Sequence, residues 1–334
     1  MTTTPVSRLS LLRAVALGAA LATVVGMSSR YCQAQGPVAG IAKATPLKME
    51  FDVASVKQNK SGPPSSGGDP MRTNVTTGPG DTFVPTGGIY SGTNVPLIVY
   101  IYFAYQMNVS QNHALELSLP AWAKEDRFDI QAKTDKRDAT KNDFRLMMRS
   151  LLEQRFGLAI HKETREGPVY ALVLEKPGKL GPRLRTHPAN DTTCTNELLS
   201  APPTPGSARR MPMVDTGGYP VTCGGIVSVE SPTVPGKLIG GARNITMEAI
   251  ANSFAGPGHL ENPVIDQTGL TGTFDFTLDF APELPPGAAP SSDAEDPRPT
   301  FRDALAQQLG LKLVSGKGSF DIWVVDHIDH PTPN

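Results

Sequence analysis

The sequence predicts an α+β fold made of two similar halves, each running strand, helix, strand, helix and hairpin. The first observation is a nine-residue pattern. Residues 152–160 recur in character as residues 305–313, with apolar side chains at the first, fifth, seventh and ninth positions and Gly at the sixth. Apolar residues spaced by four indicate a helix, and apolar residues spaced by two indicate a strand. Each copy is therefore predicted to be the end of a helix, a Gly that terminates it and the start of a strand. Each predicted element has one apolar face, so we expect helices packed on a mainly antiparallel sheet.

The first half is predicted to span residues 48–175. Alternating apolar and polar residues predict strands at 50–57, 127–132, 158–161 and 169–174, and one-sided apolar stripes predict helices at 97–107 and 144–156. Asp143 is the predicted N-cap of the second helix, and Gly157 can end that helix in a left-handed conformation. Gly167 and Pro168 are expected to turn the chain, so that the last two strands form a hairpin.

The second half, predicted to span residues 217–330, repeats this order. Segment 235–244 matches 85–94 in character, and Phe274-Asp275-Phe276 occupies the place of Phe128-Asp129-Ile130. The predicted elements are helices at 246–254 and 300–309 and strands at 264–269, 272–280, 311–314 and 320–325, with a turn at 316–318 before the last strand. A unit of about 90 residues that recurs once predicts a duplicated domain and not a solenoid.

Two Pro-rich segments interrupt these halves. Residues 176–216 predict a surface excursion, and residues 281–299 predict a mobile loop. Cys194 lies in the excursion and Cys223 follows it. Two cysteines in an exported chain most simply form one disulfide, here closing a loop of about 30 residues. The alternative is a pair of thiols on a metal ion, but no His lies within a few residues of either Cys.

The first 35 residues resemble a signal peptide, which predicts an exported protein, periplasmic or extracellular. Arg8 and Arg13 precede an uncharged run at 14–27, and small residues follow where a signal peptidase cleaves. An uncleaved anchor is the alternative, although this run is shorter than the roughly 20 residues that span a bilayer. No other segment is a transmembrane candidate. Without the leader, 28 basic and 32 acidic residues remain, which excludes the charge excess of a nucleic-acid-binding protein.

The candidate site residues are His161, Glu163 and Arg165. They share one face of a predicted strand, where a general base and a partner carboxylate would lie together, although a solvated strand face explains them as well. His327 and His330 would point to opposite faces of a strand, so we predict no metal site there. No nucleotide, nucleophile-elbow or zinc-ligand motif occurs, and no cofactor is predicted.

Aromatic residues offer a second kind of candidate site. Trp122 and Trp323, together with the aromatic side chains of predicted helix 97–107, can line a ligand groove. The helix aromatics are explained equally by burial in the core.

Several motifs resemble those of a known family. They are Phe51-Asp52-Val53-Ala54-Ser55-Val56-Lys57, Arg127-Phe128-Asp129-Ile130, Leu151-Leu152-Glu153-Gln154-Arg155-Phe156, the stretch 161–170 and the stretch 266–272. In these motifs the chain resembles the soil-associated proteins abundant in Acidobacteria, which carry a domain of unknown function. Some relatives have a similar domain fused behind a membrane metallopeptidase of the antibiotic-sensor type. The resemblance implies no catalytic residues.

From these observations we expect a non-enzymatic module of the cell envelope that binds an unknown protein or small ligand, with no nucleic-acid partner. Two alternatives remain open. One is a periplasmic hydrolase that uses His161, Glu163 and Arg165, and the other is a sensor module that acts with a membrane metallopeptidase.

Overall fold

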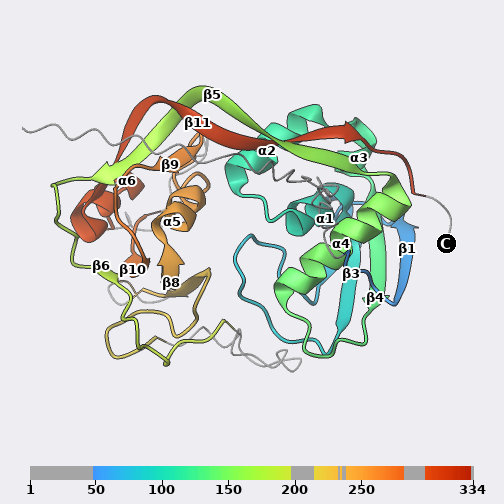
Figure 1. Cartoon of the computed structure of the whole chain (residues 1–334), viewed down its shortest axis with the longest axis horizontal. Coiled ribbons are helices and arrows are strands. Elements are labelled where there is room, and N and C mark those ends of the chain that lie inside the picture. The colour runs from blue at the N-terminus through green and yellow to red at the C-terminus, as the bar shows by residue number, and fades with distance from the viewer. Residues whose placement is uncertain (1–47, 197–213, 232–233, 235–237, 282–297, 332–334) are drawn as a thin grey trace, which may run out of the picture. The chain divides into compact units, whose positions relative to one another are not determined.

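The computed structural model describes residues 48–196, 214–231, 234, 238–281 and 298–331. The predicted leader 1–35 lies outside the described residues, as do 197–213 of the predicted excursion and 282–297 of the predicted mobile loop. The fold is α+β, with helices and three mostly antiparallel sheets (Figure 1). Among the described residues we find no helix with the length and apolar character of a membrane span.

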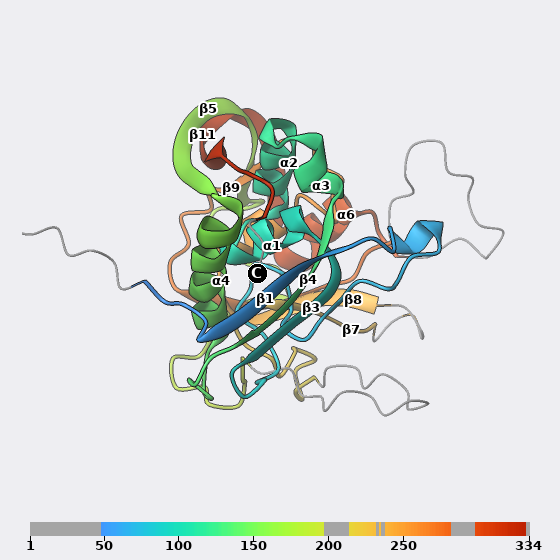
Figure 2. The same cartoon turned by 90° about the vertical axis from the view of Figure 1, so that its right-hand side faces the viewer.

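The first sheet has the strand order β1-β4-β3-β2 and carries four α-helices. Its strands are β1 Val53–Asn59, β2 Arg72–Thr73, β3 Ile89–Pro96 and β4 Arg127–Lys133. Its helices are α1 Leu97–Ala104, α2 Val109–Ser118, α3 Ala121–Glu125 and α4 Lys141–Phe156, and a short 3-10 turn, η1, spans Pro64–Ser66. Figure 2 shows β1, β4 and β3 next to one another in the sheet, and α4 beside this sheet. Aromatic side chains from α1, α4, β3 and β4 fill the core between the helices and the sheet.

Helix α4 begins one turn earlier than the sequence predicted. Thr140 is the N-cap, and its hydroxyl accepts a hydrogen bond from the backbone N–H of Asp143. Asp143 itself closes a capping box by accepting the N–H of Thr140, so the predicted N-cap is the third helical residue. The helix ends as predicted at Gly157, which is left-handed with φ +57°.

The second sheet has the strand order β6-β10-β8-β7. Its strands are β6 Leu184–Thr186, β7 Ile226–Glu230, β8 Leu238–Thr246 and β10 Thr273–Leu278. Helix α5 spans Met247–Ser253, and α6 Phe301–Ala304 continues as the π-helix η2 Leu305–Leu309. The second core lies here, with Phe254, Phe276 and Phe301 in edge-to-face contact.

The first and second sheets share an Asn–Asp hydrogen bond near the end of the strand that leads into a helix. Asn94 of β3 and Asn244 of β8 both have positive φ, +53° and +54°. The backbone N–H of each donates to an aspartate on the neighbouring strand, at 2.8 Å from Asp129 Oδ1 and 3.1 Å from Asp275 Oδ1. Asparagine tolerates this conformation better than most residues, so both positions fit the residue type.

The third sheet corrects the prediction of a hairpin in each half. Strand β5 Ala159–Leu174 continues without a turn through Gly167 and Pro168, and β11 Leu311–His327 continues without a turn through residues 316–318. The two long strands pair with each other antiparallel, with Gly167 opposite Gly318. Strand β9 Val264–Asp266 adds to β5 in parallel.

Backbone conformation explains why the predicted turns do not form. A tight hairpin turn needs positive φ, and none of the three glycines at these positions adopts it. A residue that precedes Pro is biased toward extended backbone, so Gly167 continues the strand. The strand predicted to fold back in each half instead pairs with the long strand of the other half.

The β5–β11 ladder connects the two cores (Figure 1). One end of the ladder packs on the first core through Ile160, Trp323 and Val325, and the other end contributes Leu172 and Leu311 to the second. Between these ends, residues 161–166 of β5 are exposed. The paired residues of β11 are covered in part, because Ile322 is buried and Gln111 of α2 donates a hydrogen bond to the carbonyl of Asp321.

The two helix-ending glycines differ in their surroundings, which gives a matched pair of variants. We expect Gly157→Ala to lower the free energy of unfolding by about 1 kcal/mol, because alanine resists the left-handed region. Gly310→Ala should cost clearly more, because its Cβ would lie 2.7 Å from the backbone nitrogen of Gly181, whereas the nearest atom at Gly157 is 3.4 Å away. Urea unfolding measures both, and equal losses would contradict the expectation.

Candidate functional site

A pocket with a volume of about 1070 Å³ lies between the elements of the first and second sheets. From the first half it is lined by the loop 76–82, the segment that joins α1 to α2, and basic side chains of α4. From the second half it is lined by β8, α5 and the loop before β7, and Lys162 and Trp323 reach it from the β5–β11 ladder. Residues far apart in the sequence thus converge on one cavity.

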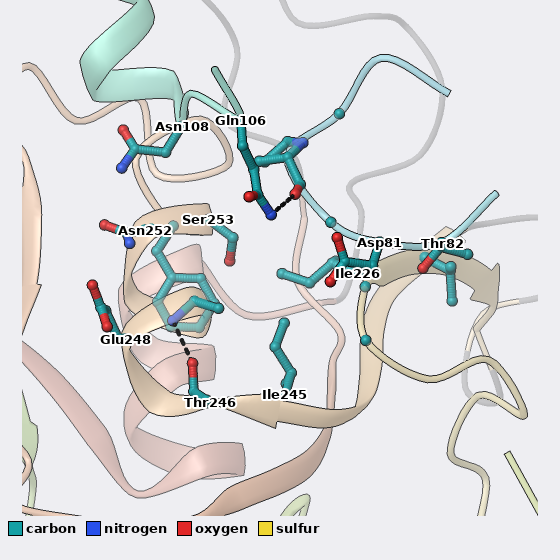
Figure 3. A pocket seen from close by; sticks show the side chains of 18 of the residues that line it. Asp81, Thr82, Gln106, Asn108, Ile226, Ile245, Thr246, Glu248, Asn252 and Ser253 are labelled. Carbon is teal, nitrogen blue, oxygen red and sulfur yellow. Dashed lines mark hydrogen bonds between the residues drawn. The ribbon is translucent and has the colours of Figure 1, made fainter. Parts of the chain in front are cut away.

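Polar side chains face one another across this pocket. Figure 3 shows Gln106 and Asn108 above Glu248, Asn252 and Ser253. Helix α5 presents its polar positions here because the apolar positions of the same helix are buried in the second core. The opposing corner is fixed by hydrogen bonds, since Gln106 donates to the carbonyl of Pro79 at 2.7 Å and Asn108 caps α2.

The loop 76–82 is held by two buried cations of α4. Lys141 donates to the carbonyl oxygens of Gly78 and Gly80 at 2.9 and 2.5 Å, and Arg145 pairs with Asp81 Oδ1 at 2.6 Å. Residues spaced by four share one helix face, so a single stripe of α4 organises the whole loop. Burial, reinforced by the neighbouring charge of Arg145, lowers the pKa of Lys141 to about 7.

A row of four side chains forms another part of the wall. The guanidinium of Arg149 lies 4.9 Å from the ring centroid of Tyr105, and Tyr105 meets Trp323 edge-on at 4.9 Å. The ammonium of Lys162 lies 5.4 Å from the centre of the Trp323 ring. All four side chains line the pocket, so cations flank an aromatic surface.

The disulfide secures the opposite side of the loop 76–82. Cys194 and Cys223 are bonded, with their Cα atoms 5.3 Å apart, which confirms the predicted pairing. The carbonyl of Cys223 accepts the Thr82 hydroxyl at 3.3 Å, and that of Gly224 accepts the N–H of Asp81 at 3.2 Å. The predicted covalent link therefore supports one wall of the pocket.

A smaller pocket of about 460 Å³ adjoins the first. The two share the lining residues Asn108, Gln111, Lys162, Glu248 and Asn252. The smaller pocket adds Asp266 and Asp321, whereas the larger adds Lys141 and Arg149. The combined cavity is consequently acidic at the β9 end and basic at the α4 end.

Comparison with known proteins places the chain in a family. A family model described as "Protein of unknown function (DUF3738)" matches residues 99–328, well over half of the chain. The chain belongs to the DUF3738 family. No curated protein and no solved structure matches it. The family description names no activity, so the function of this DUF3738 chain has to be argued from its own geometry.

The predicted candidates His161, Glu163 and Arg165 lie outside both pockets. All three are exposed on the middle of β5, where Arg165 pairs with Glu163 at 3.1 Å and lowers the pKa of that carboxyl. His161 Nδ1 lies 2.8 Å from Asp326 Oδ2, a partner that the sequence pattern does not indicate. Side chains alternate between the two faces of a strand, so Lys162 points the opposite way from His161 and Glu163. In this DUF3738 chain, Lys162 therefore lines the larger pocket and the predicted residues do not.

The C-terminal histidines are also apart from the pockets. His327 Nε2 lies 2.8 Å from Asp329, and His330 stacks on Trp122 with ring centroids 4.1 Å apart. Within the described ranges, no group of three His, Cys, Asp or Glu side chains is arranged to hold a metal ion.

A second cluster of charges is buried away from the pocket wall. Asp275 is fully buried and accepts hydrogen bonds from Arg185 Nε at 3.0 Å and from His187 Nδ1 at 2.7 Å, besides the N–H of Asn244. Arg243 lies beside it and pairs with Asp191. These bonds tie the chain around β6 to β8 and β10, which is a structural role.

Proposed function

We propose that this DUF3738 chain is an exported, non-enzymatic binding module that holds a small ligand in the pocket between its two halves. The observation that carries the proposal is the convergence of polar side chains from both halves on one cavity. Binding sites typically combine an apolar wall with a few placed polar groups. Here Ile226, Ile245 and Phe280 provide apolar surface beside the amides of Gln106 and Asn252.

The cavity is large enough for an organic ligand. Small-molecule sites usually occupy about 300–1,000 Å³, and the pocket of about 1070 Å³ is slightly larger than this range. Its walls come from segments separated by more than a hundred residues, such as Gln106 and Asn252. A ligand that contacts both walls would therefore stabilise the folded state as a whole.

Duplication of one unit accounts for this arrangement. The matching helix-ending glycines, the paired Asn–Asp hydrogen bonds and the similar order of elements support two copies of one ancestral unit. In each copy the strand after the last helix pairs with the other copy in place of folding back on itself. Two copies joined through the β5–β11 ladder would leave a cavity at their junction, where the pocket lies.

Export is supported by two features. The basic, uncharged and small-residue order of residues 1–35 is that of a signal peptide. The Cys194–Cys223 disulfide suits an oxidising compartment, and disulfides are rare in the cytosol.

Blocking the pocket tests the binding function. We expect a filtered small-molecule extract of bacterial cell envelopes to raise the melting temperature of the protein in proportion to extract concentration. Asn252→Trp fills the cavity at a residue that lines both pockets, so it should abolish this rise. Leu117→Trp is the matched control, because Leu117 is 78% exposed on α2 and lines neither pocket.

Differential scanning fluorimetry gives the readout, with circular dichroism to show that both variants fold. A rise that persists in Asn252→Trp, or that is absent from the wild type at every extract concentration, would refute the proposed binding site.

A further inference from the structure

The basic side chains at the α4 end of the pocket outnumber the acids that face them. Lys141, Arg145 and Arg149 are spaced by four along α4, and Asp81 is the carboxylate that pairs with this stripe. The Asp81 charge is matched by Arg145, which is fully buried behind the wall. Lys141 and Arg149 line the cavity itself, and neither has a carboxylate within salt-bridge distance among the described residues.

Arg149 is the side chain best placed to meet a ligand. Its Nε donates to the carbonyl of Ala104 at 2.7 Å, which fixes the plane of the guanidinium beside the Tyr105 ring. Its terminal nitrogens have no partner among the described residues, and the side chain lines the pocket. A guanidinium held in one plane can bind a carboxylate or a phosphate with two parallel hydrogen bonds.

The surroundings of Arg149 favour an aromatic ligand over one rich in hydroxyl groups. Tyr105 and Trp323 continue the row away from Arg149, and Ile226, Phe254 and Phe280 form apolar surface of the same cavity. Hydroxyl groups buried against this apolar part of the wall would lose hydrogen bonds to water, whereas polar side chains that could replace them, such as Asn252 and Ser253, lie on α5. An aromatic ring gains from contact with aromatic and aliphatic side chains alike.

We propose that the pocket selects small aromatic anions, with a carboxylate or phosphate bound by Arg149 and the ring packed against Tyr105 and Trp323. This rests on the proposed binding function and names the ligand class for the same site. The bound anion would supply the negative charge that the α4 stripe lacks. Carboxylate and phosphate ligands share this chemistry, and the two kinds of probe below distinguish them.

Trp323 provides a reporter inside the site. The chain has two tryptophans, and Trp122 lines neither pocket, so Trp122→Phe leaves Trp323 as the single fluorophore of its kind. In this background we expect para-nitrobenzoate or para-nitrophenyl phosphate to quench Trp323 in a saturable manner. The neutral para-nitrobenzyl alcohol should bind at least about tenfold more weakly, which corresponds to about 1.4 kcal/mol.

Arg149→Gln, made in the same Trp122→Phe background, should lower the affinity for the two anions to the affinity for the neutral alcohol. Arg137→Gln removes an exposed charge that lines neither pocket and should leave the preference for anions intact. Circular dichroism and the melting temperature show that both variants are folded, so a loss of preference in Arg149→Gln alone supports the proposal.

Two results would overturn the proposal and leave the binding function standing. One is equal quenching by the anions and the alcohol, and the other is absence of quenching by all three probes while the envelope extract still raises the melting temperature. Failure of the extract together with all three probes would instead overturn both proposals.

Discussion

Asp275→Asn is expected to lower the free energy of unfolding by about 3–5 kcal/mol, the range seen when one partner of a buried ion pair is removed. Asp275 has no exposed surface and accepts hydrogen bonds from Arg185 and His187, with Arg243 also nearby. Asparagine keeps the shape of the side chain but removes its charge and turns an amide N–H₂ toward these donors. Arg185 Nε would then lose its charged acceptor, and Arg243 would lose the nearby Asp275 charge while keeping its pairing with Asp191. Urea unfolding followed by circular dichroism measures the loss.

Asp135→Asn is the matched control for this change, because the Asp135 side chain is 87% exposed and its nearest cation is 3.9 Å away. We expect that variant to stay within about 1 kcal/mol of the wild type, as is usual for exposed ion pairs. If Asp275→Asn were as harmless as Asp135→Asn, the buried cluster would not stabilise the second half as described.

Leu152→Ala and Leu305→Ala are each expected to lower the free energy of unfolding by about 2–5 kcal/mol, because apolar burial is lost and a cavity remains. Both side chains are fully buried, Leu152 in the first core and Leu305 in the second. Since the two residues belong to separate clusters, the losses should add in the double variant. Urea unfolding of the two single variants and the double variant checks both points.

Leu117→Ala is the control for the leucine pair, because it removes the same atoms from an exposed position. An unchanged unfolding midpoint in both core variants would mean that neither leucine lies where it is placed here. A double variant that loses much less than the sum would show that the cores are not separate.

Local patterns in the sequence predicted the elements that local forces control. Gly157 and Gly310 end their helices in the left-handed conformation, as expected from glycine at the end of an apolar stripe. Alternation over residues 127–132 predicted β4, and Thr246 caps α5. The disulfide followed from counting cysteines in a chain expected to be exported. The helix ends, the strand and the helix cap depend on neighbours within one or two turns of chain, whereas the disulfide links residues 29 apart and followed from composition.

The sequence indicated only a small part of the candidate site: of the aromatic residues named as possible groove residues, Trp323 and Tyr105 line the pocket and Trp122 does not. His161, Glu163 and Arg165 attracted attention because they are chemically reactive types on one strand face, but that face is exposed to solvent. Helix spacing of Lys141, Arg145 and Arg149 was a readable signal that a basic stripe exists. Nothing local indicated that this stripe would be buried under the loop 76–82, because the acceptor carbonyls lie some 60 residues earlier in the chain.

Sequence alone determined the α+β class, most helix and strand positions and the Cys194–Cys223 cross-link, since these depend on side-chain periodicity, capping and composition. The tertiary structure alone decided that β5 and β11 pair with each other and that a pocket forms between the two sheets. A strand edge can pair with any compatible partner, and its own residues do not specify which one. The choice depends on which pairing lets both cores bury their apolar faces at once, and that is a property of the whole chain.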